Sequence, residues 1–234
     1  MSNQKKRNLI ALILNAIVVV LVLIYLIMRL VSAGNEILGN SGLGMLKYYT
    51  NLSNFLAGII SAIVLPYEII SFRKGKDALP LWASLIKFAV TIALLITFLV
   101  TACFLGPTNA ANGGSYWALF AGGNFIVHLL VPVTSSVCFC LFETKPVIKF
   151  RFSFVGMSTL MLYAIFYITN FYAHLIPGGG IQGQSEYDWY GFFGDKGPLG
   201  IVLTIFVMLA FSYLLSFLVW LANKKSGQKI WKDQ

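Results

Sequence analysis

Residues 116–142 read YWALFAGGNFIVHLLVPVTSSVCFCLF, a run in which nearly every side chain is apolar or small. A helix needs about 20 such residues to cross the hydrocarbon core of a bilayer, so this run predicts a membrane span. His128 lies near its middle and Asn124 one helical turn earlier. At about 1.5 Å per residue, the imidazole would lie roughly 16 Å below the end of the helix. A titratable side chain there is costly, which makes His128 a functional-site candidate.

The rest of the chain has the composition of an integral membrane protein. Of its 234 residues, 58% are hydrophobic and 11% are charged, and the mean hydropathy is +0.80. The sequence predicts an all-α, polytopic membrane protein, a bundle of six transmembrane helices in a single domain, residues 1–234. The expected spans are residues 8–32, 43–72, 80–105, 116–142, 152–174 and 198–222. The first run is about twice as long as a signal-peptide core, which favours a retained span.

The formal charge of +9 indicates topology and gives no reason to expect a nucleic-acid partner. Thirteen of the 17 basic residues fall before span 1 or after spans 2, 4 and 6, which are alternate loops. Lys and Arg concentrate in cytoplasmic loops, so both termini are expected in the cytoplasm. Nothing in the sequence indicates an oligomeric state.

Polar residues gather in the outer halves of the spans and in the loop that precedes span 6. We expect one cavity between spans 2, 4 and 5, covered by the polar and aromatic segment YDWYGFF. Thr50 and His128 are its candidate catalytic residues. The candidate substrate and oxyanion residues are Asn51, Ser53, Asn54, Asn124, Tyr163, Tyr167, Asn170, Tyr187, Asp188 and Tyr190.

This set of residue types suits acyl transfer. A hydroxyl becomes a strong nucleophile when a neighbouring imidazole takes its proton, and the oxyanion that develops needs fixed donors. Thr50 would supply the hydroxyl, His128 the base, and Asn54 or Asn124 the donors. The geometry requires span 2 to begin near Leu43, because a later start would leave Thr50 well above His128.

Structural interpretations of the same residues stay open. Thr50, Asn51, Ser53 and Asn54 could join helices by hydrogen bonds, and His128 could do the same. The polar cavity could equally bind or transport a small amphipathic molecule without catalysis. With two His and no close carboxylate pair, the sequence predicts neither a metal site nor a cofactor. Lys87 is expected to pair with Glu68, and the three cysteines to be buried small side chains.

Several short motifs together resemble a known family. YYTNLSNFLAG in span 2, NFIVHLLVP in span 4, LYAIFYIT in span 5 and the following YDWYGFF occur in the expected order. They are similar to the bacterial six-helix relatives of the androgen-induced protein family, which includes the androgen-dependent tissue-factor-pathway-inhibitor-regulating protein. Characterised animal members are intramembrane threonine hydrolases of fatty acid esters of hydroxy fatty acids.

The resemblance implies roles for particular residues. The family's nucleophilic threonine corresponds to Thr50, and its essential histidine, with an asparagine four residues earlier, corresponds to His128 and Asn124. The implied function is hydrolysis of lipid (fatty acyl) esters in a bacterial plasma membrane, with a lipid ester as substrate and no cofactor.

Overall fold

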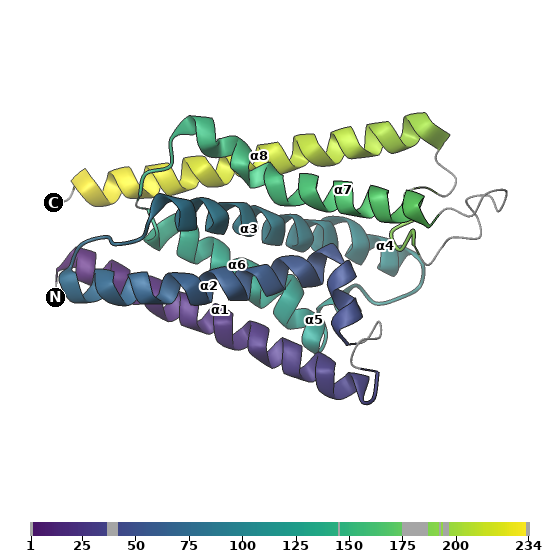
Figure 1. Cartoon of the computed structure of the whole chain (residues 1–234), viewed down its shortest axis with the longest axis horizontal. Coiled ribbons are helices and arrows are strands. Elements are labelled where there is room, and N and C mark those ends of the chain that lie inside the picture. The colour runs from purple at the N-terminus through teal and green to yellow at the C-terminus, as the bar shows by residue number, and fades with distance from the viewer. Residues whose placement is uncertain are drawn as a thin grey trace.

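The computed structural model describes residues 2–36, 42–144, 146–174, 187–191, 193 and 197–232. These residues are mostly helical, and none of them forms a strand. Six helices are long and apolar enough to cross a membrane. Figure 1 shows them side by side, with both termini at one end of the bundle and α4 and α5 at the other. The chain therefore has the architecture of a multi-pass membrane protein.

The elements along the chain are α1 (Asn3–Ala33), η1 (Leu43–Lys47), α2 (Tyr49–Lys74), α3 (Leu81–Val100), η2 (Thr101–Leu105), α4 (Gly106–Ala111), η3 (Tyr116–Phe120), α5 (Gly123–Phe125), η4 (Ile126–Leu130), α6 (Val131–Val137), η5 (Cys138–Phe142), η6 (Phe150–Met157), α7 (Ser158–Ala173) and α8 (Gly197–Lys232). The third span runs without a break through α3, η2 and α4, and the fourth runs from α5 through η5.

The third span is the centre of the bundle. In Figure 1, α3 lies between α7 and α8 on one side and α1 and α2 on the other. Its Phe88 and Ile92 pack in a core shared with α7 and α8, whereas Val90 and Leu94 pack in a core shared with α1 and α2. Apolar side chains all round α3 explain this position, because a helix that is apolar on every face is buried on every face.

Two helices begin later than the hydrophobic pattern predicts. The second begins at Tyr49, and residues 43–47 form the separate 3-10 turn η1 instead of its first turns. The fourth begins at Gly123, because Gly122 adopts a φ of +56°, a conformation that favours glycine, and this separates η3 from α5. Both changes move the catalytic candidates nearer to the ends of their helices.

Proline explains two of the wide helical turns. Pro132 and Pro107 have no N–H, so the helix before each one cannot continue its regular hydrogen-bond pattern. The π-helical turns η4 and η2 lie directly upstream of these two prolines. Widened turns of this kind occur often at functional sites, and His128 lies within η4.

The buried charges pair differently from the prediction. Lys87 does not pair with Glu68 but donates hydrogen bonds to Glu143 and Asn15. Glu143 reaches Lys87 because η5 ends there, beside α1 and α3. The cysteines are free thiols, and the interpretation as buried side chains holds for Cys138 but not for the exposed Cys103.

Candidate active site

Thr50 is the second residue of α2 and is half-buried. On the helical wheel it lies between Ser53 and Asn54, which are both buried inside the bundle. Its carbonyl accepts hydrogen bonds from the Ser53 hydroxyl, at 2.9 Å, and from the Asn54 amide, at 2.8 Å. Thr50 therefore lies at the start of α2 on the face that turns toward the other helices.

The Asn54 side chain connects this turn to the turn that carries His128. Its Nδ2 donates to the carbonyl of Val127, at 3.0 Å, as well as to that of Thr50. In the i to i+5 pattern of η4, the carbonyl of Val127 would meet the backbone nitrogen of Pro132, which carries no hydrogen. Asn54 supplies the missing donor and places the residue before His128 beside the Thr50 turn.

His128 is oriented by a backbone carbonyl. Its Nδ1 lies 2.7 Å from the carbonyl oxygen of Leu119 in η3, and the ring meets Phe120 edge to face at 6.3 Å. A carbonyl only accepts, so Nδ1 carries the proton, and in the neutral ring Nε2 is left as an acceptor. This tautomer is the one that a general base requires.

The two asparagines that were predicted to hold an oxyanion lie in different surroundings. Both hydrogens of the Asn54 amide are used by the carbonyls of Thr50 and Val127. Asn124 is exposed and faces α1. Among the described residues, no hydrogen bond joins the Thr50 hydroxyl to the His128 ring.

The predicted aromatic residues form one hydrogen-bonded cluster on α7. Tyr167 donates to the carboxylate of Asp188, and the backbone nitrogen of Tyr190 donates to the Tyr167 hydroxyl at 3.3 Å. Tyr163 donates to the carbonyl of Lys47 at 2.5 Å. The segment 187–191 is thus fixed against α7, and α7 is fixed against η1.

This cluster also caps the helix that carries Thr50. The Tyr190 hydroxyl accepts a 2.8 Å hydrogen bond from the backbone N–H of Tyr49, one of the first-turn donors that a helix leaves without an internal partner. Burial raises the pKa of the Tyr190 phenol above its ordinary value, so the phenol stays neutral and able to accept. Two predicted members stand apart: Tyr187 stacks on His174 at 4.0 Å, and Asn170 only accepts from His174 through its carbonyl.

An apolar cavity of about 180 Å³ lies next to Thr50, between α2, α3 and α7. Leu52, Leu56, Leu162 and Phe166 form most of its wall. At its polar end the Tyr49 hydroxyl lies 3.1 Å from that of Thr159, and Ser53 is beside them. Its shape and lining suit a hydrocarbon chain.

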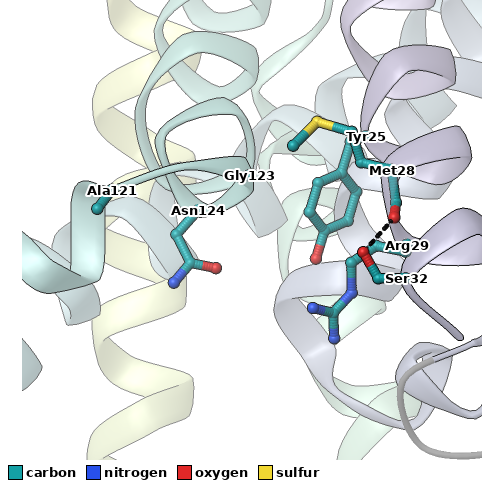
Figure 2. Close-up of a pocket in the computed structure, with 7 residues that line it drawn as sticks. All are labelled: Tyr25, Met28, Arg29, Ser32, Ala121, Gly123 and Asn124. Carbon is teal, nitrogen blue, oxygen red and sulfur yellow. Dashed lines mark hydrogen bonds between the residues drawn. The ribbon is translucent and has the colours of Figure 1, made fainter.

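A second, more polar cavity of about 270 Å³ lies on the other side of α2, between α1 and the start of α5. Figure 2 shows Asn124 on one wall and Tyr25 and Arg29 on the other. Neither this cavity nor the apolar one is lined by Thr50 or His128.

Sequence reasoning missed several residues of this region. Arg29 was detectable, as the one basic residue inside the first apolar run. Leu119 and Val127 act through backbone carbonyls, and Tyr49 through its N–H, so no side-chain pattern could have indicated them.

Within the described part of the chain, no group of three or more His, Cys, Asp or Glu side chains is arranged to hold a metal ion. Comparisons of the chain with protein-family models, curated proteins and solved structures find no match in any of the three.

Proposed function

We propose that this protein hydrolyses lipid (fatty acyl) esters within a bacterial plasma membrane, with Thr50 as nucleophile and His128 as general base. The observation that carries the proposal is the double hydrogen bond of Asn54, which holds the Thr50 turn against the His128 turn. The apolar cavity beside Ser53 supplies space for an acyl chain. The sequence motifs around both residues support the same assignment.

The mechanism follows from the chemistry of these groups. His128 Nε2 takes the proton of the Thr50 hydroxyl as Thr50 Oγ1 bonds to the ester carbonyl carbon. The alcohol leaves with that proton, and water, deprotonated by the same ring, then releases the fatty acid from Thr50. Substrate binding has to bring Oγ1 and Nε2 within hydrogen-bond reach, as catalytic contacts often tighten only in the complex.

The first turn of α2 replaces the side-chain amides as donor to the oxyanion. Backbone N–H groups in the first turn of a helix lack internal partners and lie at the positive end of the helix dipole. Tyr190 already accepts from the N–H of Tyr49, so the N–H groups of Thr50 and Asn51 are the donors that we assign to the oxyanion.

The test is covalent labelling by a long-chain fluorophosphonate together with turnover of a medium-chain ester. Both should disappear in Thr50→Val and His128→Gln and persist in Thr204→Val, a matched change on α8 whose hydroxyl only contacts its own helix. Thr50→Ser should keep measurable turnover. Labelling that is equal in wild type and Thr50→Val, or wild type that neither labels nor turns over any ester, would remove the catalytic assignment.

A non-catalytic binder of an amphipathic molecule is the second candidate. The polar cavity favours this candidate. Arg29 and Asn124 lie on opposite walls of the cavity, and neither Thr50 nor His128 lines it. In that case an anionic amphiphile would bind without being cleaved, Arg29→Gln would weaken its binding, and Thr50→Val would leave the affinity unchanged.

A further inference from the structure

A second cluster of polar groups lies at the opposite end of the bundle from Thr50, buried between α1, α2, α3 and η5. Lys87 is 1% exposed, and it donates to the Glu143 carboxylate and to Asn15. Asn15 also donates to the same Glu143 oxygen, at 2.6 Å. One oxygen of Glu143 thus carries both bonds, while Oε2 is buried without a partner.

Glu68, on α2, is close enough to this pair for their charges to act on it. It is 5% exposed, and no hydrogen bond reaches its carboxylate from the residues that the structure describes. The charged groups that act on it are Glu143 of η5, Lys87 of α3, Arg7 of α1 and Asp77, which follows α2. The Cys138 thiol lies beside Lys87, 3.7 Å from Nζ.

The charges of this cluster do not balance. Arg7 and Asp77 neutralise each other through a 2.6 Å ion pair. Among the residues that the structure describes, the remaining groups are one lysine and two carboxylates, which leaves one negative charge in a buried, largely apolar interior. An uncompensated buried charge is strongly unfavourable, so the protein must neutralise it by binding a cation.

We propose that this cluster is a proton-binding site, in which the buried Glu68 holds one exchangeable proton. Lys87 and Asn15 both donate to Glu143, so its carboxylate has fixed partners. Glu68 has no such donor and takes the proton. A bound metal cation is disfavoured because the ammonium of Lys87 already occupies the centre of the cluster.

A polar route connects the site to the end of the bundle where both termini lie. Arg7 donates to the Thr144 hydroxyl at 2.8 Å, and Thr144 directly follows Glu143. The other partner of Arg7, Asp77, is 20% exposed. Gln4, Arg7 and Asn8 each keep a buried polar atom without a partner in the same layer, where water molecules could complete a path. The proton therefore exchanges with the compartment that holds the termini.

Infrared spectroscopy of the purified full chain tests the proposal, because a protonated carboxyl has its own carbonyl band that shifts in D2O. Wild type at neutral pH should show this band, and Glu68→Gln should lose it. Glu143→Gln should lose it too, since Lys87 then balances an ionised Glu68. Glu36→Gln, a matched change at an exposed carboxylate, should keep it.

A second measurement is the thermal midpoint as a function of pH. The folded state holds a proton that an exposed glutamate releases at neutral pH, so wild-type stability should fall as pH rises. In Glu68→Gln that dependence should be smaller, and the midpoint at neutral pH should be at least that of wild type, because the amide resembles the neutral acid.

Four results would overturn the proton site. The first is that folded wild type lacks the band, and the second is that the band persists in Glu68→Gln or in Glu143→Gln. The third is that Glu68→Gln fails to fold. The fourth is that the band disappears when sodium replaces choline at constant ionic strength. None of these results depends on ester hydrolysis.

Discussion

Asn54 has a structural task that its residue type does not reveal. Pro132 leaves the carbonyl of Val127 without its helical donor, and the Asn54 amide donates to it from a neighbouring span. The same nitrogen donates to the carbonyl of Thr50. One side chain thus compensates a proline in another helix and fixes the relative position of the two catalytic candidates.

Replacing Asn54 should therefore reduce both stability and activity. Asn54→Leu keeps the approximate volume but leaves a buried carbonyl without a donor, and we expect a loss of about 1–3 kcal/mol in the free energy of unfolding. Asn170→Leu makes the same change on α7, where the amide forms no hydrogen bond within the described residues, and should be near neutral. Equal thermal midpoints for the two variants would contradict the bridging role.

At this scale the sequence predicts which residues matter better than what they do. The proximity of Thr50, Asn54 and His128 follows from their positions in the outer halves of two spans. The role of Asn54 does not, because it depends on the backbone carbonyls of Val127 and Thr50, which carry no side-chain signature. Glu143 was overlooked as the partner of Lys87 because it lies just past an apolar run.

At the scale of elements, α2 is held against α1 by a close approach of their backbones. A Cβ added at Gly58 would lie 2.7 Å from Cγ1 of Val22. Further along the same contact, the Tyr25 hydroxyl donates to Asn51 at 2.8 Å. Small residues permit this kind of helix contact in membranes, where packing has to supply most of the attraction.

Enlarging Gly58 should separate these helices. In Gly58→Val the new side chain overlaps Val22, and we expect a loss of about 1–3 kcal/mol in stability. Val22→Ala in the same chain removes the overlapping methyl groups and should restore much of the loss. The check is a double-mutant cycle on thermal unfolding: purely additive effects would show that the two residues are not in contact.

The position at which a helix starts is a feature that hydropathy does not predict well. The hydrophobic pattern predicts one helix over residues 116–142, because Ala121 and Gly122 are not polar enough to interrupt the apolar run. The break comes from the positive φ of Gly122, a backbone property. As a result His128 is the sixth residue of its helix, about 8 Å deep, much nearer to the level of Thr50 than a continuous helix would place it.

At the scale of the whole molecule, the bundle has two polar regions at opposite ends. The end with the catalytic candidates carries hydroxyls, amides, aromatic side chains and the Asp188 carboxylate, and the end with the termini carries the buried charges of Arg7, Glu68, Lys87 and Glu143. The intervening core is apolar apart from buried hydroxyl side chains such as Ser61, Thr91 and Ser212. This separation allows the proposed hydrolysis and the proposed proton binding to face different sides of the membrane.

The orientation of the bundle in the membrane can be tested directly. Basic residues follow α2 and flank η6, and these loops lie at the same end as both termini in Figure 1, so we expect this end in the cytoplasm. The starting chain has Cys103, Cys138 and Cys140 replaced by alanine. In intact cells an impermeant maleimide should label Ser115→Cys, which is exposed at the opposite end, and should label the exposed Lys76→Cys only after permeabilisation. Labelling of Lys76→Cys alone in intact cells would invert the topology, and would place the Thr50 site on the cytoplasmic side.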